Sequence, residues 1–274
     1  MRTLVIYCSH KINRELEFFL KYGYIKSPNI EFIICLNGDD FDIEKYNSQI
    51  SNLGFDNLTY IKRENVGLDF GAWGEMLNRD VDGQKYYTYF DNFIFLNNTC
   101  CGPFLPVYEK RNWVEIFTSM LTDKIKLVGP TINYYNGKMH VQSYMMCTDK
   151  IGLQIGLDNG IFDIDRNLSK EGIIEKCEVG YSLLLYKNNY TIKSLLKGQE
   201  WLCGLTLDEI LNSKNLYRLY SPHNCDMVYP DSYMSMMNIH PFEVIFFKSN
   251  RNITPHIIEK YIDIYEDLNK VRKL

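Results

Sequence analysis

The chain lacks several features that would place it in common classes of protein. No apolar run approaches the ~20 residues that a membrane-spanning helix needs, and no long run carries charges of one sign. The net charge is -4, which argues against nucleic acid as the main partner because phosphate backbones attract basic surfaces. No Gly-x-Gly-x-x-Gly follows the first apolar run, which disfavours a Rossmann dehydrogenase.

The eight cysteines show no spacing typical of a metal site, and several lie in apolar segments, as small buried hydrophobic residues do. This pattern indicates free thiols in a reducing compartment. Met1 leads directly into a strand-like run at residues 4–7, which leaves no room for a signal peptide. We therefore expect a cytoplasmic protein without a transmembrane segment. Its richness in Asn, Ile, Lys and Tyr is typical of AT-rich coding, so a virus-infected host cell is a possible setting.

The 274 residues, 46% of them hydrophobic, suffice for one large domain. In the first half, short apolar runs alternate with helix-length segments, which predicts a mostly parallel sheet flanked by helices. The expected strands there are residues 4–8, 30–36, 58–61 and 89–96, and the expected helices are 13–22, 42–53 and 69–78. In the less regular second half, the expected strands are 125–128, 141–147, 190–196 and 244–247, and the expected helices are 112–123, 149–155, 175–190 and 254–274.

A polar turn opens the third helix, directly after the third strand. Asn65, Gly67 and Asp69 thus fall at the C-terminal edge of a strand, where open α/β sheets bind small ligands. Gly67 allows close approach to the backbone, Asn65 suits a base edge or ribose, and Asp69 can accept from ribose hydroxyls or help to hold a metal. The plainer interpretation is a turn with Asp69 as the helix N-cap. A second polar turn, Asn97-Asn98-Thr99, follows the fourth strand, and the two turns together indicate one cleft that holds a nucleotide. The alternative for this second turn is a polar loop.

Three further groups of residues carry candidate chemistry. Glu178, at the start of the expected helix 175–190, is an acid in a mostly apolar setting and suits a general base, or else stabilises the helix dipole. His240, Lys248 and Arg251 can bind phosphate oxygens, or can be a solvated strand end. The cluster His140, Gln142 and Ser143 can recognise sugar hydroxyls, or can be the entry to an edge strand.

Five segments occur in an order that resembles a known family: ENVGLDFGAW, FIFLNNTCCGPFLP, GPTINYYNGKMHVQSYMMCTDKIGL, CEVGYSLLLYKNNYTI and HPFEVIFFKSNR. They are similar to the rhamnan-synthesis-F-like glycosyltransferases, including their large-virus and eukaryotic relatives. The resemblance implies a GT-A-like, Rossmann-like fold that binds a nucleotide-sugar, with Glu178 as the catalytic base. Cys177 stands where many related enzymes have a second acid. Asn97-Asn98-Thr99 stands where many have Asp-x-Asp, so we expect no required cofactor, although Mn²⁺ or Mg²⁺ remains possible.

The motifs and the resemblance together predict a glycosyltransferase in one domain. Residues 1–105 would form the nucleotide-binding half, 106–253 the acceptor-side half, and 254–274 a C-terminal helix. A UDP- or dTDP-linked sugar would pass to a hydroxyl of a glycan or protein-linked acceptor by inverting displacement. The donor would lie against Ser9, Asn37, Asn65, Gly67, Asp69 and Asn97–Thr99, with Lys248 and Arg251 at the diphosphate. His140, Gln142, Ser143 and His240 would face the acceptor or the sugar.

Two rival functions stay open. One is a non-catalytic nucleotide- or sugar-binding module of the same fold. The other is a hydrolase that uses Cys100 or Cys101 with His140.

Overall fold

The computed structural model describes residues 1–38, 41–52, 54–135, 137–163, 168–216, 226–233, 237–251 and 255–272. The strands are β1 (Thr3–Ser9), β2 (Ile30–Asn37), β3 (Leu58–Arg63), β4 (Asp80–Val81), β5 (Gln84–Lys85), β6 (Asn92–Asn97), β7 (Cys100–Cys101), β8 (Ile125–Gly129), β9 (Ile132–Tyr135), β10 (Lys138–Val141), β11 (Met145–Asp149), β12 (Thr191–Ser194) and β13 (Phe247–Lys248). The α-helices are α1 (Arg14–Tyr22), α2 (Ile43–Asn52), α3 (Leu68–Leu77), α4 (Trp113–Thr118), α5 (Lys150–Asp158), α6 (Lys170–Ile173), α7 (Gly180–Lys187), α8 (Leu207–Leu211), α9 (Pro241–Val244) and α10 (Pro255–Arg272). Two 3₁₀-helices, η1 (Tyr86–Tyr89) and η3 (Lys197–Leu202), and a π-helix, η2 (Ile174–Val179), complete the described elements.

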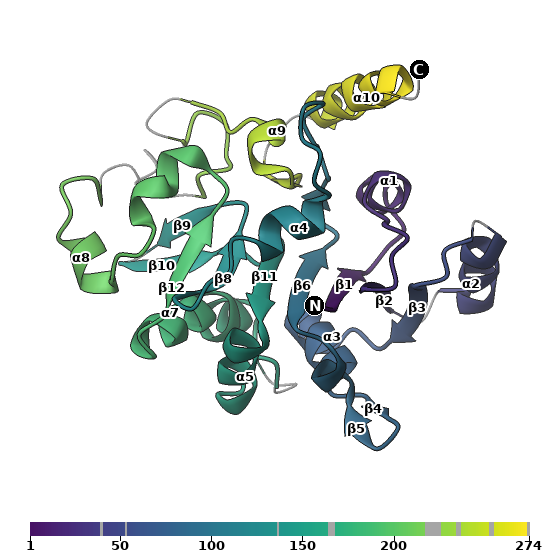
Figure 1. Cartoon of the computed structure of the whole chain (residues 1–274), viewed down its shortest axis with the longest axis horizontal. Coiled ribbons are helices and arrows are strands. Elements are labelled where there is room, and N and C mark those ends of the chain that lie inside the picture. Colours follow the sequence, from purple (N-terminus) through teal and green to yellow (C-terminus); the bar gives the residue numbers. More distant parts are fainter. Residues whose placement is uncertain are drawn as a thin grey trace.

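Seven strands form the central sheet in the order β12-β8-β11-β6-β1-β2-β3. Neighbouring strands are parallel except β11, which runs antiparallel to both β6 and β8. Helices cover both faces, with α1, α4 and α10 on one side and α3, α5 and α7 on the other (Figure 1). The predicted fold class is confirmed in its architecture: the structure has a mixed, mostly parallel sheet flanked by helices.

The sheet is buried on both faces because its strands are short, nearly continuous apolar runs. Phe70 and Trp73 of α3 pack on one face, and Phe19 of α1 and Trp113 of α4 pack on the other. In the described part of the chain, no helix is both long enough and apolar enough to cross a membrane.

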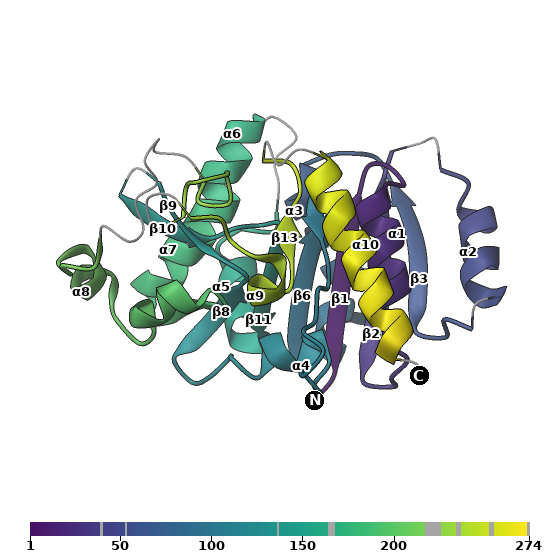
Figure 2. The same ribbon diagram turned by 90° about the horizontal axis from the view of Figure 1, so that it is seen from above.

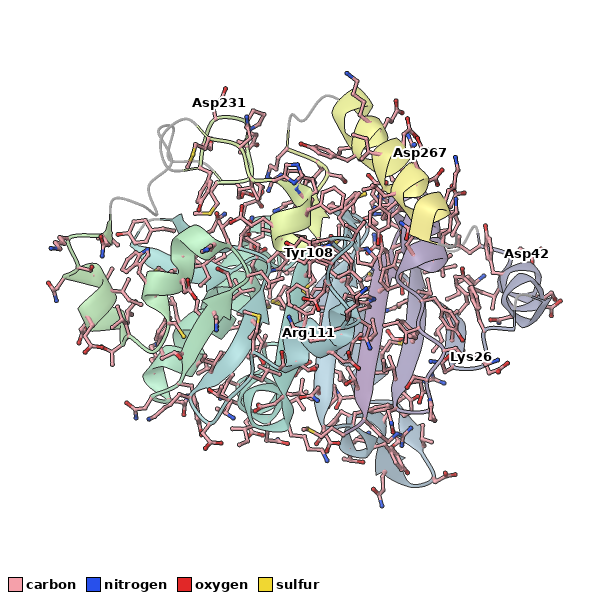
Figure 3. All side chains as sticks on the ribbon, turned by 45° about the horizontal axis from the view of Figure 1, so that its top comes forward. Lys26, Asp42, Tyr108, Arg111, Asp231 and Asp267 are labelled. Carbon is pink, nitrogen blue, oxygen red and sulfur yellow. The ribbon has the colours of Figure 1, made fainter. Side chains whose placement is uncertain are left out.

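Helix α10 lies across α1, as Figure 2 shows. Its Ile262 and Tyr265 pack against Phe18 and Phe104, and its Glu266 forms a 2.7 Å ion pair with Lys21. The opposite side of α10 is open to solvent, where Asp267 is 75% exposed (Figure 3). The predicted C-terminal helix is thus present and packs on its own chain; residues 254, 273 and 274 of the expected range lie outside the described residues.

Several boundaries differ from the expected ones. Of the expected strand 244–247, only Phe247 lies in a strand, β13, because Val244 ends the short helix α9, in which Pro241 is the first helical residue. The expected strand 141–147 is divided between β10 and β11, with three connecting residues that carry site side chains. Helix α4 ends at Thr118, five residues before the expected end.

Candidate active site

The polar ends of four neighbouring parallel strands meet at one edge of the sheet. Strands β3, β2, β1 and β6 lie side by side and end at Arg63, Asn37, Ser9 and Asn97. The side chains of Ser9, Asn37 and Asn97 are nearly buried, and Ser9 Oγ bonds the backbone of Lys11. This edge is where the sequence predicts a nucleotide.

Asn37 organises the loop after β3. Its Nδ2 donates to Asn65 Oδ1 at 3.3 Å and to the Leu68 carbonyl at 3.3 Å. Its Oδ1 accepts from Arg63 Nη1 at 3.0 Å, and Arg63 Nη2 also donates to the Val66 carbonyl at 2.8 Å. Arg63, which is 7% exposed and was not predicted, therefore fixes the loop that carries the exposed Asn65. The position of Arg63 at the end of a strand was the sequence signal that could have identified it as a site residue.

Asp69 is not the N-cap of α3. Gly67 holds that position with a left-handed φ of 70°, which glycine adopts without strain. Asp69 instead accepts a 2.8 Å hydrogen bond from Asn97 Nδ2 and thus joins the two polar turns. Burial raises the pKa of Asp69 to about 6, and the nearby charge of Glu178 acts in the same direction.

Asp69→Asn is expected to stabilise the protein at pH 8. The folded protein holds the Asp69 proton more tightly than the unfolded chain, whose aspartates titrate near ~3.9, so the wild type loses stability as pH rises from about 4 to about 6. An amide avoids this loss and can still accept from Asn97, so the gain is on the order of 2–3 kcal/mol. Urea unfolding of both proteins should show that gain at pH 8 and almost none at pH 4. Equal or lower stability of the variant at pH 8 would refute a buried charge at Asp69.

The polar groups in the Asp-x-Asp position form hydrogen bonds within the chain. Asn97 Oδ1 accepts from both the backbone N and the Oγ1 of Thr99, at 3.0 and 2.7 Å, and Asn97 Nδ2 is bound to Asp69. The Asn98 carbonyl accepts from Asn13 Nδ2 at 3.0 Å. Within the described residues, no group of three or more His, Cys, Asp or Glu side chains is placed to hold a metal ion.

Beside this edge lies a cavity of about 630 Å³. Its walls come from β9, β10, the α6–η2 helical segment and the strand end at β13. The lining residues are Asn133, Tyr134, Lys138, His140, Gln142, Glu171, Ile174, Glu175, Glu178, Val179, Asp226, Tyr229, Lys248 and Arg251. The structure thus brings together Glu178, His140, Gln142, Lys248 and Arg251, all of which the sequence singles out.

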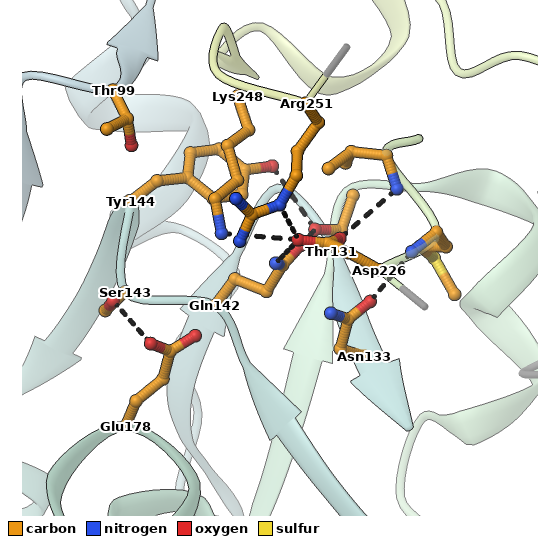
Figure 4. A network of polar contacts seen from close by, with 12 residues as sticks. Thr99, Thr131, Asn133, Gln142, Ser143, Tyr144, Glu178, Asp226, Lys248 and Arg251 are labelled. Atoms are coloured by element: carbon orange, nitrogen blue, oxygen red, sulfur yellow. Dashed lines mark hydrogen bonds and ion pairs between the residues drawn. The ribbon is translucent and has the colours of Figure 1, made fainter. Parts of the chain in front are cut away.

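Glu178 lies inside a continuous helical segment rather than at its start. The π-turn η2 separates α6 from α7, and such turns are frequent at functional sites. Glu178 Oε2 accepts from Ser143 Oγ at 2.8 Å (Figure 4). The Ser143 carbonyl lies 3.5 Å from Asn97 Nδ2. Ser143 therefore connects the carboxylate in the cavity to the donor-side turns.

A carboxylate that was not predicted, Asp226, holds the cationic side of the cavity. Its Oδ2 accepts from Gln142 Nε2 at 2.6 Å, Arg251 Nε at 2.9 Å and Lys248 Nζ at 3.3 Å (Figure 4). These two cations hold the pKa of Asp226 below its usual range against the effect of burial. Ser249 donates to the Thr99 carbonyl at 2.7 Å, so the cations lie close to the Asn97–Thr99 turn. No local pattern distinguishes Asp226 from other loop acids.

Two sets of predicted residues lie elsewhere. His240 is exposed and caps α9, with its ring stacked on Phe242, and it does not line the cavity. Burial raises the pKa of the Cys100 and Cys101 thiols, which disfavours either as a nucleophile. The described cysteines all carry free thiols, as expected, and Cys225 lies outside the described residues.

A larger open groove, of about 910 Å³, lies on the helical layer between α3 and α5. Arg63 borders it, but Glu178, Lys248 and Arg251 do not. We place the candidate site in the smaller cavity because buried acidic and basic side chains, Glu178, Asp226 and Lys248, converge there.

Solved structures with distant similarity include three enzymes. A Bacillus anthracis protein described as a putative glucose-1-phosphate thymidylyltransferase, crystallised with sucrose, has 10% identity and a TM-score of 0.42, covering 71% of this chain and 86% of its own. The glycosyltransferase GlyE of Streptococcus pneumoniae TIGR4 has 8% identity and a TM-score of 0.47, covering 99% of this chain and 63% of its own, so this chain spans under two thirds of GlyE. An active-site mutant of LgtC has 10% identity and a TM-score of 0.42, covering 97% of this chain and 95% of its own. These similarities are too distant to carry an argument about function.

Among curated proteins the chain has no match. The model of one family, described as rhamnan synthesis protein F, matches residues 33–155. This segment contains the first three of the five motifs, while the CEVGY and HPFEV motifs lie beyond it. Residues 33–155 therefore carry the sequence pattern of the rhamnan synthesis protein F family, which confirms the resemblance predicted from the motifs.

Proposed function

We propose that this protein is a glycosyltransferase that moves a sugar from a UDP- or dTDP-linked donor to a hydroxyl of a glycan or glycoprotein acceptor. Glu178 takes the proton from the acceptor hydroxyl, whose oxygen attacks the anomeric carbon in a direct, inverting displacement. The nucleoside diphosphate leaves with the electron pair of the broken bond.

The observation that carries this proposal is that one cavity has an acidic side chain on one wall and basic side chains on another. Glu178 lies on the helical wall, while Lys248 and Arg251 lie on the wall next to the Asn97–Thr99 turn. An acceptor hydroxyl needs a carboxylate base, and a leaving diphosphate needs cations. A guanidinium has five N–H donors, so Arg251 can serve Asp226 and a phosphate together.

The two halves of the chain divide this work. The base and ribose lie against the first half, at Ser9, Asn37 and the loop from Asn65 to Asp69. The sugar and the acceptor lie against the second half, where His140, Gln142 and Ser143 line or border the cavity. His240 has no part in this arrangement, since it caps α9 outside the cavity.

The transfer is expected to survive chelation of divalent cations. The Oδ1 atom of Asn97 already accepts two hydrogen bonds from Thr99. The cations that face the diphosphate are therefore Lys248 and Arg251. Activity assayed in excess EDTA should stay close to activity in Mn²⁺. Complete loss in EDTA, restored by Mn²⁺, would contradict this part of the proposal.

The proposal is tested by nucleotide release from a panel of nucleotide-sugars. Purified protein should release UDP or dTDP from one donor faster when acceptor glycans are present. If a nucleotide binds but no donor is consumed with any acceptor, the non-catalytic binding module becomes the better account. The neutral Asn97-Asn98-Thr99 turn is the feature that favours that second candidate.

A further inference from the structure

The Glu178 carboxylate has a second polar neighbour, the imidazole of His140. Nε2 of His140 lies 3.7 Å from Oε1 of Glu178, and the two side chains are only 6% and 11% exposed. The other carboxylate oxygen, Oε2, is held by Ser143 at 2.8 Å. Each oxygen of Glu178 therefore has a partner of its own, and His140 faces the one that Ser143 leaves available.

His140 is neutral at physiological pH. Burial lowers the pKa of its imidazole, and this effect outweighs the nearby charge of Glu178. The other groups that act on it are Asp226 and the backbone of Lys138, which raise the pKa, and Lys248 from β13, which lowers it. A neutral imidazole carries one N–H and one lone pair, so it can accept a hydrogen bond from a protonated carboxyl group.

We propose that Glu178 and His140 form a dyad that holds the acceptor proton between them, an inference that rests on the proposed function. The acceptor O–H bond breaks, the proton goes to Oε1 of Glu178, and the acceptor oxygen bonds to the anomeric carbon as the diphosphate leaves. The new Oε1–H then donates to Nε2 of His140, and the contact shortens from 3.7 Å to hydrogen-bond length. After the products leave, the proton passes to solvent.

This arrangement answers a difficulty of the proposed chemistry. A carboxylate is a weak base for a sugar hydroxyl, and proton transfer works better when the base holds its proton more firmly. A hydrogen bond to the neutral form of a carboxyl group favours that form. His140 acts through Glu178 and is therefore a positioning residue, and its ring lines the cavity without being the base.

His140→Gln tests the dyad by kinetics. Glutamine keeps a polar group near Nε2 but cannot match the basicity of an imidazole nitrogen. We expect kcat to fall about 10-fold or more, KM to stay nearly constant, and the acid limb of the pH–rate profile to move to lower pH. A residue that only supports the fold would lower thermal stability and leave the acid limb in place, and that result would overturn the dyad.

A second measurement does not depend on transfer. The ¹⁵N resonances of His140 should titrate at lower pH in Glu178→Gln than in the wild type, because the Glu178 charge raises the pKa of the imidazole. The resonances of His240, which lies against Phe242 outside the cavity, serve as the internal control. An unchanged His140 titration would overturn the dyad. If the His140 titration shifts to lower pH but the protein consumes no sugar donor, the interaction between Glu178 and His140 is supported and the proposed function fails. The two failures are therefore distinguishable.

Discussion

Replacing Glu178 with glutamine is expected to lower the turnover of sugar transfer by about 10²–10⁴-fold while leaving donor binding nearly unchanged. Glutamine has almost the same shape and can still accept from Ser143, so the cavity should keep its form. The amide cannot take the acceptor proton, and that step is lost. Steady-state kinetics and direct donor titration on the same preparation separate the two effects.

Glu175→Gln is a suitable control for this experiment. Glu175 belongs to the same π-turn and borders the same cavity, but it is 72% exposed and pairs with Lys138 at the rim. Its variant should keep turnover close to that of the wild type. Normal turnover in Glu178→Gln would show that Glu178 is not the base.

Removing the carboxylate of Asp226 should strongly lower the stability of the protein. Asp226 is 8% exposed and accepts from Lys248, Arg251 and Gln142. Asp226→Ala leaves the largely buried Lys248 and the part-buried Arg251 without their counter-charge, and losing one partner of a buried ion pair costs about 3–5 kcal/mol. Since Arg251 is 29% exposed, we expect the lower end of that range, or a melting temperature about 6–12 °C lower.

Asp267→Ala provides the matched control for Asp226→Ala. Asp267 pairs with Lys270 at 2.8 Å, but both side chains are 75% exposed, so its loss should change stability very little. Pyrophosphate should raise the melting temperature of Asp226→Ala more than that of the wild type, because the two cations are then offered to the added anion. A wild-type melting temperature in Asp226→Ala would contradict the role of this cluster.

The parts of the fold that depend on local pattern were predictable. Strands β1, β2 and β3 are short apolar runs that end in polar residues. Because these strands pair in parallel, their ends place Ser9 and Asn37 at the same edge of the sheet. Helix α10 follows from its mixed-charge, amphipathic pattern. The expected strand at residues 244–247 was wrong except at Phe247, which belongs to β13, because Pro241 begins a short helix that continues to Val244.

The parts of the site that depend on long-range contacts were not predictable. Asp226 meets Gln142 across 84 residues of sequence, and nothing near Asp226 in the chain signals this pairing. Glu178 was identified as a candidate base, but its π-turn was not, because the sequence periodicity of residues 170–187 is that of an ordinary helix. His240 stood out by residue type, yet its neighbour Pro241 fixes it as a helix cap instead.

The central claim is that the sheet edge formed by Ser9, Asn37 and the loop from Asn65 to Asp69 binds the nucleotide of a sugar donor. The most direct test is thermal-shift binding of UDP, dTDP, GDP, CMP and ADP, each with and without Mn²⁺. We predict a clear rise in melting temperature with UDP or dTDP, of similar size without metal. No shift with any of the five nucleotides would contradict a donor site at this edge.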